Sequence, residues 1–331
     1  VISLMDADLL DDWLGTYLGR EEESYAQYSD ISVLVCSWNL DASQPRDVLV
    51  QGQERAARES SLVRRTGHAP EIIVAAFQET VDLEDKKKTA RTFLTLTRKK
   101  NKTPNATAHE KQHKLWQEAM AEAVLPVAYR TMVAQYMVGL TCLVFVRADV
   151  AAARVETELV EAQKVKTGFK GYHGNKGGLV ARLTVDDTSL CFVVAHLAAG
   201  QEHIPSRNKD AATILDETEF RTSGTKFVHA AEGRYIADHH HVWFIGDLNY
   251  RIEGERNPLV SVWSNDQLVR VRCPPRPTAS VHGRVTAAPA LGPFLEGPLG
   301  FVPTYKYDPG SDEWDTSDKQ RLPAWCDRIL F

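Results

Sequence analysis

The sequence predicts a single α/β domain, and three observations support that prediction. Short apolar runs that end in glycine or in polar residues alternate with segments of helical periodicity along most of the chain. No linker-like stretch divides these segments into two groups. The composition, with 43% hydrophobic and 25% charged residues, is ordinary for a globular protein with a sizeable core. A length of 331 residues permits one large domain or two small ones, so the unbroken mixture of strands and helices favours one.

The chain is expected to open with a helix and two strands. Within 6–30, apolar side chains recur at helical spacing, which predicts an amphipathic lead-in before the main domain, 31–331. The alternating, β-branched run 31–38 predicts a strand, and the apolar run 71–77 predicts a second, buried one. The polar, arginine-rich segment between them predicts a helix.

The remaining elements follow the same periodicities. We expect a helix at 115–124, strands at 129–138, 140–147, 154–166, 179–185 and 190–196, a helix at 205–220 and a final strand at 325–331. Glycines predict a loop at 167–178. The segment 252–298 shows no regular period and is expected to be irregular, with an insertion at 273–293.

The stretch 241–251 contains the clearest strand and the first candidate site. Residues 242–246 are apolar or lack a polar side chain, as in a strand buried on both faces. A carboxylate and an amide follow, and because residues two apart point to the same side of an extended chain, Asp247 and Asn249 lie together at the strand's end. The same residues also suit an Asx turn that caps the strand.

Several other expected strands end in a polar group that can bind a metal or donate a hydrogen bond. One buried strand with such an end means little, but a series of them predicts a shared rim where these groups meet. The residues are Asn39, Glu79, His196, Asp247 with Asn249, and Asp327.

Composition excludes several classes of protein. The chain has no apolar run of transmembrane length, and its acidic first residues lack the features of a signal peptide. Five scattered cysteines without a CxxC pair predict free thiols in a reducing compartment. A net charge of −5 argues against a general nucleic-acid binder. Because the chain starts at Val1 and not at methionine, we expect it to be part of a longer protein.

Motifs from about residue 31 to residue 331 resemble those of the inositol polyphosphate 5-phosphatase family, whose superfamily includes DNase-I-like endonucleases and neutral sphingomyelinases. They are SWNL (37–40), FQE (77–79), GYHGNKGGL (171–179), AHLAAG (195–200), RN-x-D (207–210), WFIGDLNYRI (243–252), PTYKYD (303–308) and SDKQRLPAWCDRIL (317–330). The resemblance implies a four-layer α/β/β/α sandwich, DNase-I-like, with two sheets packed face to face and helices outside.

The resemblance also implies a catalytic apparatus. Glu79 and Asn39 offer hard oxygen ligands suited to Mg²⁺, which would act as a Lewis acid on the scissile phosphate. Asp247 is the candidate to orient or deprotonate the attacking water, and Asn249 to hydrogen-bond the transition-state oxygens. His196 is expected to contact the 5-phosphate, although a lone histidine of this kind is more often a satisfied core residue.

The aspartate of WCDR, Asp327, is the last expected catalytic residue. In the family it pairs with the histidine of a Ser-Asp-His motif on a later strand. No such motif follows Asp327 in this sequence. We expect that strand to lie in an unrecorded tail.

Substrate recognition is expected to fall to basic residues. The resemblance places Tyr305, Lys306 and Arg321 on the 4-phosphate, with further contributions from Lys176, Arg207, Asn208 and Lys319. A guanidinium grips phosphate through two parallel hydrogen bonds, and lysine supplies a point charge. Any one of these residues, taken singly, is more often a solvated surface charge.

Two basic clusters flank Phe93, Leu94 and Leu96, which lie after the FQE motif, where the family resemblance places an acyl-chain-contacting region. One interpretation is a mobile, solvated insertion, and the other is a loop that touches an anionic membrane.

The leading functional hypothesis is Mg²⁺-dependent hydrolysis of the 5-phosphate of phosphatidylinositol 4,5-bisphosphate, phosphatidylinositol 3,4,5-trisphosphate or soluble inositol polyphosphates. The enzyme would be a monomeric domain in the cytoplasm, peripheral at membrane surfaces, with no nucleic-acid partner. The alternatives are a DNase-I-like endonuclease, and a non-catalytic phosphoinositide-binding module if the chain truly ends at Phe331.

Overall fold

The computed structural model describes part of the chain, and its contacts separate residues 1–32 from residues 33–331. The described residues are 16–17, 27–45, 69–81, 104–124, 127–168, 173–221, 233–254, 266–272 and 290–331. The second unit holds every strand that the structure describes. Within the described residues, no helix is both long and apolar enough to cross a membrane.

The first sheet has four strands in the order β1-β2-β4-β3. Its central strand β2 is buried along its whole length, as its apolar sequence IIVAAFQ predicts. β1 and β2 run parallel, whereas β4 is antiparallel to both of its neighbours. The strands are β1 (Val33–Asn39), β2 (Ile72–Gln78), β3 (Tyr129–Met137) and β4 (Leu140–Arg147).

The second sheet has five strands in the order β5-β6-β7-β8-β9. β7 and β8 run parallel, and the other neighbours pair antiparallel. The strands are β5 (Glu161–Gly168), β6 (His173–Val185), β7 (Thr188–His196), β8 (His241–Asp247) and β9 (Asp327–Leu330). Each sheet therefore contains one parallel pair, whose carboxyl ends lie at one edge.

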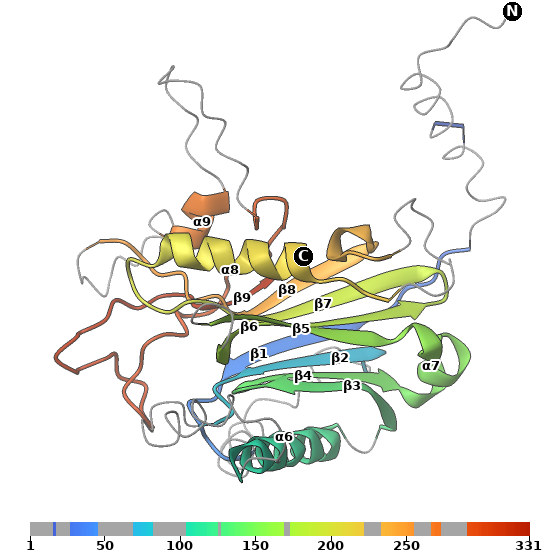
Figure 1. The fold of residues 1–331 in the computed structure, drawn as a ribbon, viewed down its shortest axis with the longest axis horizontal. Helices are drawn as coiled ribbons and strands as arrows, with labels where there is room; N and C mark the ends of the chain where they lie inside the picture. Colours follow the sequence, from blue (N-terminus) through green and yellow to red (C-terminus); the bar gives the residue numbers. More distant parts are fainter. Residues whose placement is uncertain are drawn as a thin grey trace, which may run out of the picture. The chain divides into compact units, whose positions relative to one another are not determined.

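Helices cover the outer faces of the two stacked sheets (Figure 1). α8 (Ile204–Glu217) lies on the five-stranded sheet and α6 (Pro104–Ala123) on the four-stranded one. On α6, Trp116 is buried with its ring centroid 5.0 Å from that of Phe77 on β2. The short helices are α7 (Ala148–Ala153) and α9 (Gln267–Arg272). This arrangement confirms the expected four-layer α/β/β/α sandwich.

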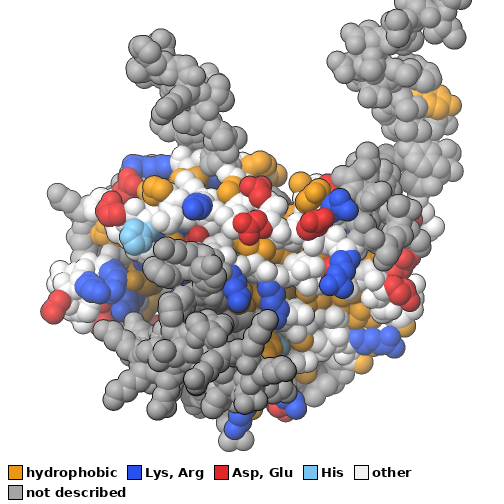
Figure 2. Space-filling view, in the orientation of Figure 1, with side chains coloured by type: hydrophobic (Ala, Val, Ile, Leu, Met, Phe, Trp, Pro, Cys, Tyr) orange, Lys and Arg blue, Asp and Glu red, His pale blue; other side chains and the backbone are white. Residues whose placement is uncertain are grey.

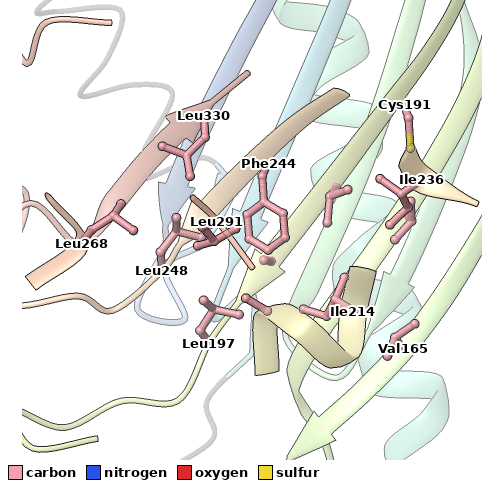
Figure 3. Packing of buried hydrophobic residues seen from close by; sticks show 14 of the residues in the cluster. Val165, Cys191, Leu197, Ile214, Ile236, Phe244, Leu248, Leu268, Leu291 and Leu330 are labelled. Carbon is pink, nitrogen blue, oxygen red and sulfur yellow. The ribbon is translucent and has the colours of Figure 1, made fainter. Parts of the chain in front are cut away.

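The core between α8 and the five-stranded sheet shows how strand alternation assigns side chains to faces. Ile214 of α8 packs in one buried cluster with Val193 and Ala195 of β7 and Phe244 of β8 (Figure 3). Because successive strand residues point to opposite faces, the intervening residues of β7, which end at His196, face the other sheet.

The surface and the cysteines agree with the composition. Figure 2 shows Lys and Arg side chains interspersed with Asp and Glu side chains over the described part of one face. Cys36, Cys142, Cys191 and Cys326 are free, as expected, and Cys273 lies outside the described residues.

Several element boundaries differ from the expectations. β5 begins at Glu161 and not at residue 154, because residues 157–159 form a 3₁₀ turn. β6 begins inside the expected glycine-rich loop, since Gly177 pairs with Lys166 and with His196. α6 begins well before residue 115, with a proline in its first turn, where the missing N–H is tolerated.

α9 interrupts the segment expected to be irregular. Other expectations fall outside the described residues. These are most of the lead-in helix at 6–30, the helix through Arg65, most of the insertion at 273–293, and Phe93, Leu94 and Leu96.

Candidate active site

The expected rim exists at the edge where the two sheets meet. The parallel pair β1 and β2 ends at Asn39 and beside Glu79, and the parallel pair β7 and β8 ends at His196 and Asp247. Asn39 Nδ2 donates to Asp247 Oδ2 at 3.0 Å, which joins the two sheets at the site. Polar strand ends far apart in the sequence therefore converge, as the sequence predicted.

The carboxylates of Asp247 and Asp327 come from paired strands. β9 runs antiparallel to β8 and starts with Asp327 directly opposite Asp247. Burial, and then the negative charge of Asp247, raise the pKa of Asp327 above its ordinary value. Asp327 Oδ1 is buried and has no hydrogen-bond partner among the described residues.

Three side chains form a group that can hold a cation. His196 Nε2 lies 3.7 Å from Glu79 Oε1 and 3.4 Å from Asp247 Oδ2. One ligand atom from each residue falls within 4.8 Å of the others. Two carboxylates and one imidazole form a donor set that suits a divalent cation. Glu79 also has a φ of 51°, a strained conformation for a residue other than glycine and typical of functional sites.

Two expectations about this group change in detail. The sequence predicts that His196 contacts the 5-phosphate, and the structure adds that it stands with the two carboxylates that can bind a metal. Asn39 was expected as a ligand, yet its Oδ1 already accepts a hydrogen bond from the backbone N of Asp41 at 3.1 Å, and its amide nitrogen binds Asp247. Asn39 therefore also orients the carboxylate.

Positive charge keeps Asp247 ionised. Burial tends to raise its pKa, but the hydrogen bond and charge of His196, followed by the charge of Lys176, lower that pKa below its usual range. Lys176 Nζ contacts His196 Nε2 and is half-buried. Burial in turn lowers the pKa of the Lys176 amine. The site thus combines an ionised carboxylate with a nearby lysine amine, a pairing that suits an anionic substrate.

Gly246 allows Asp247 to reach the rim. Its φ is 135°, and a Cβ at this position would lie 2.0 Å from the backbone O of Ala195 on the neighbouring strand. No residue with a side chain fits between the two strands without moving one of them.

The Asx turn considered for Asp247 and Asn249 is present. Asn249 N donates to Asp247 Oδ1 at 3.0 Å, while the second carboxylate oxygen faces His196 and Asn39. The side chain of Asn249 donates through Nδ2 to Leu197 O at 3.1 Å. Its Oδ1 accepts from Arg251 at 2.6 Å, so the amide is held at both ends.

Arg207 does not line an open pocket, contrary to the expectation. It is fully buried and donates to the backbone O atoms of Ala198 at 3.1 Å and Gly200 at 2.6 Å, and to Gln267 Oε1 at 2.7 Å. These carbonyls belong to the loop after His196, which lacks strand partners. Asn208 likewise accepts a hydrogen bond, from Tyr250 Oη at 2.6 Å. The side chains of Arg207 and Asn208 are therefore used in contacts that stabilise the segments next to the site.

The expected substrate-reading residues lie on a connected loop. Asp315 is buried. Its backbone N–H donates a hydrogen bond to Lys306 O at 3.0 Å, and its Oδ2 accepts one from the backbone N of Arg321 at 2.9 Å. Tyr305 approaches the catalytic residues, because the Arg251 guanidinium lies 3.7 Å from its ring centroid. Lys319 is exposed on the adjoining turn.

Sequence reasoning missed Arg251, Asp315 and Gln267. A signal existed for Arg251, which lies two positions beyond Asn249 just as Asn249 lies two beyond Asp247. Asp315 and Gln267 carry no comparable signal, since their contacts are made with residues distant in the chain.

Comparisons with known proteins agree with this geometry. The protein-family model described as "Endonuclease/Exonuclease/phosphatase family 2" matches residues 36–331. A probable inositol polyphosphate 5-phosphatase of Schizosaccharomyces pombe is 36% identical over 350 residues, covering 100% of this chain and 28% of the relative. The Type II inositol 1,4,5-trisphosphate 5-phosphatase of Mus musculus is 32% identical, covering 100% and 30%. The chain thus spans less than a third of either relative.

A solved structure is similar over most of its length. It is the inositol polyphosphate 5-phosphatase domain of SPsynaptojanin in complex with inositol (1,4)-bisphosphate and calcium ion, with a TM-score of 0.69 and 26% identity. The match covers 96% of this chain and 81% of that one. Cimex nitrophorin, with a TM-score of 0.52 and 16% identity over 91% of this chain and 86% of that one, shares the fold alone.

Proposed function

Because this chain belongs to the endonuclease/exonuclease/phosphatase family 2, as an inositol polyphosphate 5-phosphatase catalytic domain, we propose that it hydrolyses the 5-phosphate of an inositol ring. The substrates would be phosphatidylinositol 4,5-bisphosphate, phosphatidylinositol 3,4,5-trisphosphate or soluble inositol polyphosphates. The observation that carries the proposal is the group Glu79, His196 and Asp247, gathered from both sheets within 4.8 Å.

The proposed cation is Mg²⁺, held by Glu79 and Asn39, with His196 and Asp247 beside them, so that the Asp247 carboxylate can act on the attacking water. Bound there, it would polarise the scissile phosphate as a Lewis acid. Carboxylate oxygens are the hard ligands that this ion prefers. A similar domain was solved in complex with a calcium ion, which supports a divalent cation in proteins of this fold.

The protein groups position water and neutralise charge, which is most of what phosphoryl transfer requires. Asp247 is ionised and can orient the attacking water and take its proton. As the water oxygen bonds to phosphorus, the bond from phosphorus to the ring oxygen breaks. The ring oxygen takes up a proton from solvent and leaves as a hydroxyl, and Asp247 returns its proton to solvent. The Asn249 amide would donate to a non-bridging oxygen, and Lys176 with His196 would balance the charge of the 5-phosphate.

Asp327 is proposed to orient an imidazole, as the family resemblance implies. Its buried Oδ1, without a partner among the described residues, is suited to accept that hydrogen bond.

Substrate selection is proposed to fall on the loop that carries Tyr305, Lys306 and Arg321. Asp315 hydrogen-bonds the backbone of both Lys306 and Arg321 and lies 3.4 Å from the Arg321 guanidinium, so it keeps these two cationic residues close together. Exposed Lys319 on the adjoining turn extends the positive charge. We propose that these residues bind the 4-phosphate.

We also propose a cytoplasmic, monomeric domain that touches anionic membranes through Phe93, Leu94 and Leu96. Those residues lie outside the described part of the structure. Lipid substrates would be reached at that surface.

Phosphate release tests the proposed function. Wild-type protein with Mg²⁺ should release phosphate from a panel of soluble and lipid inositides, and chelation with EDTA should abolish the release. Asp247→Asn should lower the rate by about 10²–10⁴-fold, because the base that orients water is lost. Asp187→Asn, at an exposed turn, is the matched control and should leave the rate unchanged.

Full activity in Asp247→Asn would overturn the mechanism. Nicking of plasmid DNA without release of inositol phosphate would favour the endonuclease alternative, and lipid binding without turnover would favour the non-catalytic module.

A further inference from the structure

Arg251 lies between a catalytic residue and a substrate-reading residue and contacts both. Its side-chain N–H groups donate to Asn249 Oδ1 at 2.6 Å and to Asn249 O at 3.2 Å. Its guanidinium lies 3.7 Å from the centroid of the Tyr305 ring. Arg251 is buried, so these contacts and not solvent determine its position.

We propose that Arg251 is a positioning residue that couples the orientation of the Asn249 amide to the Tyr305 ring. The inference rests on the proposed function, in which Asn249 meets the transferred phosphate and Tyr305 meets the 4-phosphate. The inference adds that the Tyr305 ring affects catalysis even when the substrate has no 4-phosphate.

The first step of the argument concerns the amide. An asparagine side chain has one acceptor and two N–H donors. With Oδ1 held by Arg251 and one N–H spent on Leu197 O at 3.1 Å, one N–H remains to point toward the rim. Without Arg251, the oxygen loses its partner and the amide can turn away from the direction that catalysis requires.

The second step concerns what holds Arg251. Its backbone N donates to Gln267 Oε1 at 2.9 Å, and the same oxygen accepts from Arg207 at 2.7 Å. Gln267 Nε2 donates to Gln201 O at 3.1 Å, so the backbone of Arg251 is tied to the loop after His196. The guanidinium end is held by the Tyr305 ring, because a planar cation stacks favourably on an aromatic face.

The third step concerns residue type. A guanidinium can stack on a ring and donate in its own plane at the same time, whereas a lysine ammonium lacks that planar fork. Arg251→Lys therefore keeps the charge but cannot make both contacts. A lysine that restored full coupling would contradict the proposed geometry.

The experiment uses the soluble substrate inositol 1,5-bisphosphate, which lacks the 4-phosphate, beside inositol 1,4,5-trisphosphate. Tyr305→Leu removes the ring and should lower kcat on the bisphosphate by about tenfold, since a misplaced catalytic donor loses much of its effect. In an Arg251→Met background, the same Tyr305→Leu change should alter that kcat by less than about twofold, because the link is already broken. Arg251→Lys should behave as Arg251→Met.

The matched control is Tyr307→Leu. Tyr307 lies on the same loop and stacks on Trp314, with ring centroids 4.3 Å apart. Removal of this ring should leave kcat on the bisphosphate within about twofold of wild type if the Arg251 contact, and not general integrity of the loop, transmits the effect. Thermal unfolding of each variant separates misfolding from lost coupling. If Arg251→Met fails to fold, the effect of Tyr305→Leu is measured in an Arg251→Lys background instead.

The outcomes separate this inference from the proposed function. No phosphate release by wild type from these two substrates or from the lipid inositides of the panel would refute the proposed function itself. Normal release by wild type, with Tyr305→Leu changing only the KM for the trisphosphate, would overturn the coupling and leave the function standing. Equal losses in Tyr305→Leu and Tyr307→Leu would overturn the coupling as well.

Discussion

At the scale of single residues, Asp247 shows how one side chain serves both structure and chemistry. Its Oδ1 accepts a hydrogen bond from the backbone N of Asn249 at 3.0 Å, which closes the turn. Its Oδ2 accepts a hydrogen bond from Asn39 Nδ2 at 3.0 Å and lies 3.4 Å from His196 Nε2. The two interpretations of this carboxylate, strand cap and catalytic group, are therefore compatible, because each uses a different oxygen.

The glycine before Asp247 gives a prediction at the same scale. Gly246→Ala should lower the free energy of unfolding by at least about 2 kcal/mol and impair phosphate release, because the added Cβ meets Ala195 O and separates the strands that carry His196 and Asp247. Urea unfolding and rate measurements check this. Gly297→Ala, where an added Cβ meets nothing within 4 Å, is the control, and equal effects at the two positions would refute the argument.

At the scale of elements, α6 is the clearest case of a helix extended by its tertiary context. The sequence predicts only its second half, 115–124, because the first half, PNATAHEKQHK, is mostly polar. In the structure, His113 and Trp116, three positions apart, are both buried, and the His113 ring lies 4.6 Å from that of Tyr136 on β3. Packing of His113 and Trp116 against the sheet stabilises a helix that sequence propensity alone does not favour.

His113 makes stability depend on pH. Burial, and then the charge of Lys164, lower its pKa from 6.5 to about 4. Below about pH 6.5 the unfolded chain therefore binds a proton that the folded protein does not. The contribution of His113 is fully present above pH 6.5, and stability should fall between pH 6.5 and 4 by up to about 1.4 kcal/mol per pH unit.

Unfolding free energies at pH 7 and pH 5 check this prediction. His113→Gln should reduce the difference between the two values, whereas His241→Gln, at an exposed position, should leave it unchanged. An unaltered pH dependence in His113→Gln would show that other groups are responsible.

At the scale of the whole molecule, a buried ionic network attaches the short strand β9 to the rest of the fold. Arg328 is fully buried and binds Glu296 at 2.6 and 2.7 Å and Asp266 at 3.0 Å. Arg272 of α9 also binds Glu296, at 3.1 Å. The network therefore fixes the strand that places Asp327 opposite Asp247.

Arg328→Met should lower the free energy of unfolding by about 3–5 kcal/mol, because it leaves the carboxylates of Asp266 and Glu296 buried with less compensating charge. Arg270→Met breaks an ion pair with Glu253 in which both side chains are over 40% exposed, and should cost less than about 1 kcal/mol. Chemical denaturation of both variants measures the contrast. Similar costs would show that burial does not strengthen the network.

Much of the fold and the site could be predicted from local sequence. Most strands were predicted within a few residues, since alternation and continuous apolar runs are local signals. A shared rim of Asn39, Glu79, His196, Asp247 with Asn249, and Asp327 is predicted because a series of expected strands end in such polar groups. The membership of the family, predicted from motifs, is confirmed by the family model that matches residues 36–331.

The sequence by itself therefore determined the family, the layered α/β class and the side chains gathered at the rim. Only the tertiary structure decided the partners: Arg207 supports a loop from inside, His196 stands between two carboxylates, and Arg251 joins Asn249 to Tyr305. The physical reason is distance along the chain. Asn39 and Asp247, 208 positions apart, hydrogen-bond only because two separate sheets stack in one register, and no local pattern encodes that contact.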